Sequence, residues 1–189
     1  MISLLESTLH LPGDVIECGV YRGNSFQLIC RAVAETSPDK RIYACDSFEG
    51  FPKKKVGRID LGTHWILSRV RRKYRLCQDT PARLERFFES FNVNGQIVKG
   101  FFSETLERFS NEQFCFIHLD CDLYVSYGQC LELLYHTLVP GGVFVFDDYG
   151  SPNWPGAKEA VDEFFSSKKE SVCLCEDLPI PSWYVRKPQ

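Results

Sequence analysis

The sequence predicts an α/β fold: a mostly parallel β-sheet with helices on both of its faces. The first observation behind this prediction is that short β-like runs alternate with stretches of helical periodicity along the chain. The second is that some of these runs contain almost no polar residues, as expected of strands that helices cover on both sides. The chain has 189 residues, 44% hydrophobic and 25% charged. It can bury a sizeable core, and we expect one domain over residues 1–189.

The first two predicted strands run into turns with glycine and acidic residues. Residues 14–19 form the first strand, and a turn at residues 20–24 leads into a helix. Apolar residues at helical spacing predict its buried face: Phe26, Ile29, Cys30 and Val33. Residues 41–45 form the second strand, which Asp46 closes. Residues 51–79 carry most of the basic clusters and form a long connection, which we expect to be a lid.

The sequence pattern in the middle of the chain predicts a helix, a short strand and a second helix. Thr80 and Pro81 have the character of an N-cap and a first helical residue. Four residues are expected to form the buried stripe of this helix: Leu84, Phe87, Phe88 and Phe91. Residues 96–99 form the third strand, and the turn at residues 100–103 leads into the next helix.

Residues 114–119 form the fourth strand, and Asp120 ends it. The next helix is predicted to stop at residues 140–142, and its buried residues are Tyr127, Leu131, Leu134 and Leu138. Residues 143–146 form a fifth strand that runs into Asp147 and Asp148.

The end of the chain predicts one more helix and a pair of strands. The helix has five apolar residues on one face: Ala157, Ala160, Val161, Phe164 and Phe165. Residues 171–175 and 182–186 are expected to form a closing antiparallel hairpin. Five βα units followed by a hairpin match the seven-stranded sheet of methyltransferases better than they match the paired halves of a dehydrogenase sheet.

Charge and cysteine content exclude several classes of protein. A formal net charge of −3 gives no overall reason to expect binding to nucleic acid or to an anionic membrane. The 9 cysteines are odd in number and lack paired C-x-x-C spacing, so we expect reduced thiols and a cytoplasmic protein. No apolar run approaches the roughly 20 residues that cross a bilayer.

The first two strand ends suggest a site for an adenosine-containing cofactor. Gly19 and Gly23 lie in a turn where residues without a Cβ atom let a ligand approach the backbone closely. Asp46, about 25 residues further on, is placed to accept the hydroxyls of a ribose. A tight turn without a ligand explains the glycines equally well, and a nicotinamide dinucleotide would suit the same features.

Four acids follow the fourth and fifth strands, and they point to a metal. Asp120, Asp122, Asp147 and Asp148 would converge at neighbouring strand ends, where their mutual repulsion is costly without a cation or a proton. Magnesium takes oxygen ligands and keeps room for waters or a substrate hydroxyl. The alternative is that Asp122 or Asp148 acts as the N-cap of a helix.

Six segments follow one another in a specific order: VIECGVYRG at 15–23, DSFEGFP at 46–52, GFFSETL at 100–106, DCDLY at 120–124, GGVFVFDDY at 141–149 and KEAVDEF at 158–164. In sequence and order they resemble the motifs of the macrocin O-methyltransferase family, which methylates sugar hydroxyls on macrolides and related natural products. The resemblance implies a Rossmann-like class I methyltransferase domain that uses S-adenosylmethionine and Mg²⁺. It also leaves open a homo-oligomer.

The resemblance assigns roles to particular residues. Asp120, Asp147 and Asp148 are the implied magnesium ligands, and Asp122 is the implied general base. Glu17 and Gly19 are expected at the methionine part of the cofactor, and the full set of expected cofactor residues is Glu17, Gly19, Tyr21, Gly23, Asn24, Ser25, Asp46, Ser47, Gly100, Phe101 and Asp120.

Several other polar and aromatic residues have two possible roles each. His64 lies in the basic segment and is an alternative base when the lid closes, or simply a surface histidine. The basic clusters recognise an anionic substrate or form a solvated lid. His118 is expected in the core rather than as a ligand. Tyr149 and Trp154 line a sugar cleft or pack in the core.

The expected function is therefore transfer of a methyl group from S-adenosylmethionine to a hydroxyl of a small molecule, a sugar or a glycan. Magnesium and a carboxylate base prepare that hydroxyl. Two rival classes are a nucleotide-dependent oxidoreductase and a non-catalytic cofactor-binding assembly partner. The first needs a hydride-relay constellation that the sequence lacks, and the second would have lost the metal acids, which are all present.

Overall fold

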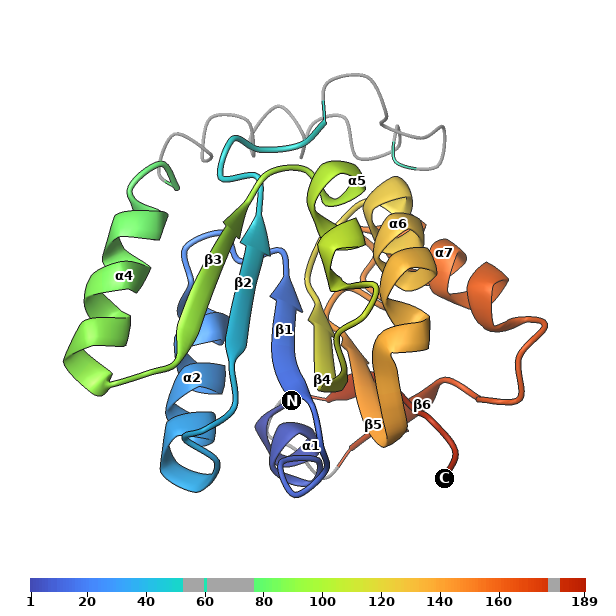
Figure 1. Ribbon diagram of the computed structural model, residues 1–189. Coiled ribbons are helices and arrows are strands. Elements are labelled where there is room, and N and C mark those ends of the chain that lie inside the picture. The colour runs from blue at the N-terminus through green and yellow to red at the C-terminus, as the bar shows by residue number, and fades with distance from the viewer. Residues whose placement is uncertain (53–59, 61–76, 177–180) are drawn as a thin grey trace.

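The computed structural model describes residues 1–52, 60, 77–176 and 181–189. Its centre is a seven-stranded sheet in the order β3-β2-β1-β4-β5-β7-β6 (Figure 1). The strands are β1 (Asp14–Cys18), β2 (Ile42–Asp46), β3 (Gly95–Lys99), β4 (Phe114–Leu119), β5 (Leu138–Phe146), β6 (Cys173–Cys175) and β7 (Ser182–Arg186). The first five pair in parallel, whereas β7 is antiparallel to both β5 and β6. This is the sheet that the sequence predicts, including its closing hairpin.

Helices lie on both faces of this sheet, as predicted (Figure 1). The longer ones are α2 (Asn24–Thr36), α4 (Thr80–Phe91), α6 (Tyr124–Leu134) and α7 (Pro155–Phe165), and the short ones are α1 (Ile2–Glu6) and α5 (Phe102–Thr105). One core cluster packs α1, α2 and α4 on the sheet through Leu5, Phe26 and Leu84. The other packs α6 and α7 on the opposite face through Leu131 and Val161.

Residue Leu138 is where the prediction fails most clearly. We predict it as the last buried residue of a helix, but α6 ends at Leu134 and a 3₁₀ turn covers Tyr135–Thr137. Leu138 instead begins β5, where it pairs with Phe114 of β4. Strand pairing therefore decides the conformation of a residue whose spacing also fits a helix, and β5 continues through the Pro-Gly-Gly segment that is predicted to stop the helix.

Smaller errors concern α4 and the N-terminus. Phe91 is 51% exposed, so it is not part of the buried stripe that Leu84 and Phe87 form. The N-cap of α4 is Asp79, one residue before the predicted Thr80. Helix α1 was not predicted, and it packs Leu4 and Leu5 into the core.

The strand order positions a site. Between β1 and β4 the chain reverses the direction in which it adds strands, and ligands of open α/β sheets bind outside the carboxyl ends of strands at such a point.

Within the part of the chain that the structure describes, no helix is both long and apolar enough to cross a membrane. All nine cysteines are free thiols, and only Cys173 is exposed.

Candidate active site at the carboxyl ends of the strands

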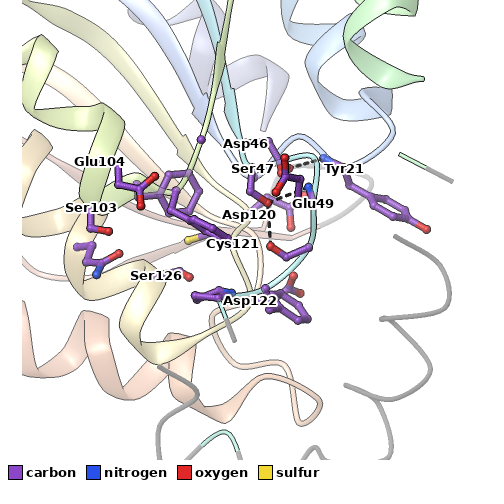
Figure 2. A pocket seen from close by; sticks show the side chains of 18 of the residues that line it. Tyr21, Asp46, Ser47, Glu49, Ser103, Glu104, Asp120, Cys121, Asp122 and Ser126 are labelled. Carbon is purple, nitrogen blue, oxygen red and sulfur yellow. Dashed lines mark hydrogen bonds between the residues drawn. The ribbon is translucent and has the colours of Figure 1, made fainter. Parts of the chain in front are cut away.

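A cavity of about 750 Å³ opens at the carboxyl ends of the parallel strands (Figure 2). Its lining comes from the ends of β1 to β4, from the segment after β2 and from the beginnings of α5, α6 and α7. The lining includes Gly19, Tyr21, Asp46, Ser47, Phe51, Gly100, Phe101, Asp120, Cys121, Asp122 and Trp154. The cavity therefore lies at the point where the strand order reverses.

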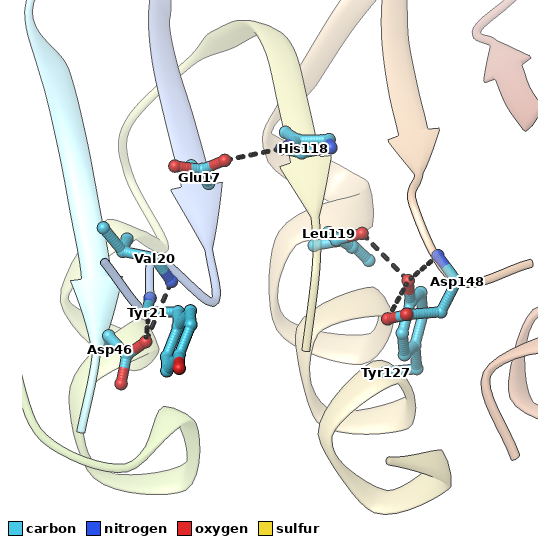
Figure 3. A network of polar contacts seen from close by, with 8 residues as sticks. All are labelled: Glu17, Val20, Tyr21, Asp46, His118, Leu119, Tyr127 and Asp148. Atoms are coloured by element: carbon cyan, nitrogen blue, oxygen red, sulfur yellow. Dashed lines mark hydrogen bonds and ion pairs between the residues drawn. The ribbon is translucent and has the colours of Figure 1, made fainter. Parts of the chain in front are cut away.

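Asp46 holds the turn that follows β1. Its Oδ2 accepts hydrogen bonds from the backbone N–H groups of Val20 (2.8 Å) and Tyr21 (2.9 Å) (Figure 3). Its Oδ1 accepts one from the backbone N–H of Phe48 (2.7 Å). These bonds stabilise Tyr21 at a φ of 48°, which is uncommon for a side chain that has a Cβ atom. Asp46 thus stabilises the turn after β1, and it also lines the cavity.

Gly19 lets the ends of β1 and β4 approach each other. Its φ is +92°, and a Cβ atom built there would lie 1.8 Å from the backbone oxygen of Asp120. A backbone atom cannot move aside as a flexible side chain can. Glycine is required here by both conformation and space, which brings Asp120 next to the first turn.

Most residues expected to meet the cofactor line the cavity. They are Gly19, Tyr21, Asp46, Ser47, Gly100, Phe101 and Asp120. The residues that begin α2 do not: Gly23 is the N-cap of that helix at a φ of 76°, and Asn24 and Ser25 form its first turn.

Glu17 also lies away from the cavity lining. It is fully buried, and its Oε1 lies 2.7 Å from Nδ1 of His118, which is 1% exposed (Figure 3). Among the described residues, Glu17 Oε2 and His118 Nε2 have no hydrogen-bond partner. The structure places His118 in the core, in agreement with the expectation, and it pairs Glu17 with this histidine behind the strand ends instead of exposing it to the cavity.

The three acids expected to bind a metal come together. Each of Asp120, Asp147 and Asp148 offers a carboxylate oxygen, and these oxygens lie within 4.8 Å of one another. Burial, followed by the charges of Asp147 and Asp148, raises the pKa of Asp120 well above its usual value. Burial and the charge of Asp147 raise the pKa of Asp148 to about 6. Their convergence costs free energy without a cation, and three carboxylate oxygens suit the ligand preference of magnesium.

Helix capping does not account for these acids. The N-cap of α6 is Leu123 and that of α7 is Trp154. The alternative in which Asp122 or Asp148 is an N-cap is therefore wrong.

Asp122 lines the cavity in an unusual backbone conformation. Its φ is 63°, and its N–H donates a hydrogen bond to Asp148 Oδ2 (3.0 Å). Burial, and then the charges of Asp148 and Asp120, raise the pKa of its carboxyl group well above its usual value. A carboxyl with a raised pKa is a better proton acceptor at neutral pH than an ordinary one.

The other candidate base, His64, lies outside the described residues, as does most of the basic segment 51–79. Within that segment Asp60 is described and 1% exposed, and its Oδ1 accepts a hydrogen bond from the N–H of Tyr124 (3.2 Å), the first residue of α6. Sequence patterns do not single out Asp60, because a contact between residues 64 positions apart leaves no local pattern.

Aromatic residues form one side of the cavity. Trp154 packs edge-on to Phe51 with ring centroids 5.9 Å apart, and both line the cavity. Tyr149 does not: its ring packs on Trp183 and its hydroxyl donates to Asp162. Several lining residues were not expected, namely Glu49, Phe102, Ser103, Glu104, Cys121, Ser126 and Gln129.

Solved structures share this fold. The O-methyltransferase NovP superposes with a TM-score of 0.78 at 23% identity, covering 100% of this chain and 79% of that one. The calicheamicin methyltransferase CalS11 superposes with a TM-score of 0.72 at 24% identity, covering 97% of this chain and 76% of that one.

Curated relatives are similar in sequence. The mycinamicin III 3''-O-methyltransferase of Micromonospora griseorubida is 30% identical over 85% of this chain and 64% of its own length. An O-methyltransferase of Streptomyces olivaceus, named for the 4'-position of a rhamnosyl-tetracenomycin C, is 33% identical over 74% of this chain and 54% of its own. The demethyldecarbamoylnovobiocin O-methyltransferase of Streptomyces niveus is 27% identical over 82% and 59%.

These curated relatives are longer proteins, since the chain spans 54% to 64% of the lengths of the first two. The profile of one family matches residues 6–176, which include every strand of the parallel sheet and all the acids around the cavity. With this match, and with the fold and motifs in agreement, the chain belongs to the family described as Macrocin-O-methyltransferase (TylF).

Proposed function

We propose that this chain transfers the methyl group of S-adenosylmethionine to a hydroxyl of a sugar on a glycosylated natural product, and that it uses Mg²⁺ and a carboxylate base. The observation that carries the proposal is the meeting of two groups of residues at one cavity. Asp46 and the turn after β1 line the cavity, and so does Asp120, whose carboxylate oxygen lies within 4.8 Å of those of Asp147 and Asp148. Family membership and the names of the relatives support this reading.

The cofactor would lie along the ends of β1, β2 and β3. Asp46 is the acid at the end of β2, and one lone pair of its Oδ1 is available for a ribose hydroxyl beyond the bond from Phe48. Gly19 and Gly100 keep the backbone accessible beside it, at positive φ values of 92° and 143°. S-adenosylmethionine would supply an electrophilic methyl group on a sulfonium ion.

Asp120, Asp147 and Asp148 would hold the metal ion, because their carboxylate oxygens already lie within 4.8 Å of one another. A bound divalent cation would lower the pKa of the acceptor hydroxyl, as it lowers that of water. Asp122 is the residue that takes the hydroxyl proton. It lies on the cavity surface, two residues after Asp120, and its raised pKa suits a base that works near neutral pH.

The acceptor would enter beside Phe51 and Trp154. Their rings and Asp122 line the same cavity, an arrangement that suits packing of a sugar ring on the aromatic faces. Burying the reacting hydroxyl between these rings and the acids would position it, and positioning contributes much of the acceleration in such transfers.

The decisive test is a screen of glycosylated macrolides, aminocoumarins, free sugars and simple phenols with S-adenosylmethionine labelled in its methyl group. We expect label in glycosylated acceptors and little in phenols without sugar. Label in phenols alone would overturn the substrate class, and no label in any acceptor, with or without Mg²⁺, would count against an active methyltransferase in this chain.

The same acceptors, incubated in parallel with a nicotinamide cofactor, address the rival classes. An oxidoreductase would consume a nicotinamide cofactor with one of these acceptors, and a non-catalytic binding partner would retain S-adenosylhomocysteine without any turnover. We favour the methyltransferase because the acids around the cavity are present and converge.

A further inference from the structure

Tyr127 carries a buried hydroxyl group beside the acids. The side chain has no exposed surface, and its ring packs against Phe146 with centroids 6.5 Å apart. The hydroxyl oxygen lies 2.9 Å from the backbone oxygen of Leu119 and 3.3 Å from Asp148 Oδ2 (Figure 3). It also accepts a hydrogen bond from the backbone N–H of Asp148 (3.3 Å). The hydroxyl therefore contacts both the last residue of β4 and the second residue after β5.

These contacts join the two segments that carry the acidic cluster. Asp120 directly follows Leu119, and Asp147 directly precedes Asp148. A single side chain from α6 thus connects the end of β4 to the end of β5. The backbone N–H of Asp147 also donates to Leu119 O (3.0 Å), so the two ends are joined directly as well, and Tyr127 adds a side-chain contact that reaches the carboxylate of Asp148.

The same contacts orient the carboxylate of Asp148. Its Oδ2 receives the hydrogen bond from Asp122 N–H at 3.0 Å and lies within reach of the Tyr127 hydroxyl. The single proton of the hydroxyl is shared between Leu119 O at 2.9 Å and Asp148 Oδ2 at 3.3 Å. Both contacts of the Asp148 carboxylate are on its Oδ2 side, which leaves Oδ1 for another partner. Tyr127 therefore acts on the metal cluster through Asp148, and through Asp148 it also acts on the backbone of Asp122.

Packing alone does not explain a tyrosine at this position. A phenylalanine would fill the same space without the cost of burying a polar oxygen, which is tolerated only when that oxygen is hydrogen-bonded. Burial raises the pKa of the Tyr127 hydroxyl well above its usual value, so the group stays protonated and can donate. The contribution specific to tyrosine is the hydroxyl, and all three of its contacts are with the strand ends that carry the acids.

We propose that Tyr127 is a positioning residue of the metal site: its hydroxyl, in contact with Leu119 O and with the N–H and Oδ2 of Asp148, holds the carboxylate of Asp148 in place relative to the end of β4. The inference rests on the proposed function insofar as the acids bind a divalent cation. Hydrogen-bonded partners of metal ligands change metal affinity by about 10- to 100-fold when they are removed. We expect a loss of this size from Tyr127→Phe.

The test measures Mn²⁺ affinity by electron paramagnetic resonance, without cofactor or acceptor. Tyr127→Phe should bind Mn²⁺ about 10- to 100-fold more weakly than the wild type. The matched control is Tyr43→Phe: Tyr43 is 3% exposed in the same core cluster, but its ring contacts are with Phe109, Phe114 and the Arg41 guanidinium and not with the acids of the cluster. The control should bind Mn²⁺ as the wild type does.

The possible results separate this inference from the proposed function. Equal affinity in Tyr127→Phe and wild type would overturn the positioning role and leave the metal site standing. An equal loss in both variants would overturn the role as well, because the effect would then belong to core tyrosines in general. A wild-type chain that takes up no Mn²⁺ would overturn the metal site, and the inference with it.

A second measurement does not depend on whether Tyr127→Phe folds. A 3-fluorotyrosine at position 127 keeps the hydroxyl, and its fluorine resonance reports on the surroundings of the ring. Saturation with Mg²⁺ should shift this resonance but leave that of a 3-fluorotyrosine at position 43 unchanged. A resonance at position 127 that does not move would contradict contact between the hydroxyl and a metal ligand.

Discussion

Asp122 combines two unfavourable states in one residue. Its φ of 63° lies in the left-handed region, which costs an aspartate about 1 kcal/mol or more. Burial of its carboxyl group, and then the charges of the neighbouring acids, raise its pKa. The hydrogen bond from its N–H to Asp148 helps to hold this conformation. Strained residues with perturbed pKa values gather at functional sites, which is why we place the base here and not at a neighbouring acid.

We predict that Asp120 and Asp122 respond differently when each is changed to asparagine. Asp122→Asn should lose about 10²- to 10⁴-fold in turnover, because the base is removed while the metal cluster remains. Asp120→Asn should weaken Mn²⁺ binding, and excess metal should partly restore its turnover. Steady-state kinetics and Mn²⁺ titration measure both effects. Normal turnover in Asp122→Asn together with an inactive His64→Ala would assign the base to the histidine.

The raised pKa values also predict how stability depends on pH. A carboxyl whose pKa is higher in the folded chain keeps its proton better when folded. Its stabilising contribution is present below the usual value of 3.8 and is lost as the pH rises through about 6, the value for Asp148. Burial raises the pKa of Asp120 in the same direction.

The Tm of the metal-free protein should therefore fall between pH 5 and pH 7, by about 3 °C or more if these acids lose about 1 kcal/mol. Mg²⁺ should restore most of the loss at pH 7 and little at pH 5, where the acids hold protons that compete with the cation. Asp162 and Glu170 have lowered pKa values and change stability only at lower pH. A metal-free Tm that increases steadily from pH 5 to pH 7 would contradict this reading of the cluster.

At the scale of elements, α6 and α7 begin side by side around Asp60. The Asp60 carboxylate accepts a hydrogen bond from the first residue of α6 and lies against Gly156 in the first turn of α7. A Cβ atom at Gly156 would lie 2.2 Å from Asp60 Oδ1 and 2.9 Å from the backbone nitrogen of Tyr124. The close approach of the two helices therefore depends on a glycine.

We predict that Gly156→Ala destabilises the chain by about 1 to 3 kcal/mol, because the added methyl group meets backbone as well as a side chain. The matched control is Gly128→Ala in α6, where a Cβ atom has nothing within 4 Å. That change should stabilise the chain by roughly 0.5 to 1 kcal/mol, since alanine favours the helix more than glycine does. Urea denaturation measures both, and equal effects from the two substitutions would show that the contact with Asp60 is unimportant.

The sequence predicts the elements where local pattern and packing agree. The apolar spacing of α2 marks Phe26, Ile29 and Cys30, and all three are buried. It fails at Leu138, where pairing with Phe114 outweighs a spacing that fits a helix equally well. It also fails at Phe91, because periodicity alone does not tell where the sheet surface under a helix ends.

For the site, the sequence locates acids but not their partners. Parallel strands bring their carboxyl ends to one edge, so Asp46, Asp120 and Asp148 can be placed without coordinates. The pairing of Glu17 with His118 depends on the register of β1 and β4, which only the assembled sheet provides. The hydroxyl contacts of Tyr127 depend on the rotation of α6 as well.

At the scale of the whole molecule, membership of a methyltransferase family predicts which cofactor stabilises the fold. S-adenosylhomocysteine at 100 times its dissociation constant should raise the free energy of unfolding by about 2.7 kcal/mol, because it binds only the folded chain. NAD at the same concentration should have no effect. Calorimetry and thermal shift measure both, and stabilisation by NAD alone would contradict the proposed methyltransferase.

The cysteines also allow local unfolding of the chain to be followed by chemical labelling of their thiols. Seven of the nine thiols are buried, while Cys173 is exposed and Cys175 is half-buried on the edge strand β6. An alkylating reagent would thus modify the edge strand first and reach the interior sulfur atoms only when the sheet and its helices separate. Cys121 lies in the cavity lining, and burial raises its pKa to about 12, so it stays an unreactive thiol in the folded chain. Mass spectrometry of the labelled chain over time would give the opening rate around each sulfur atom, without any probe having been added to the protein.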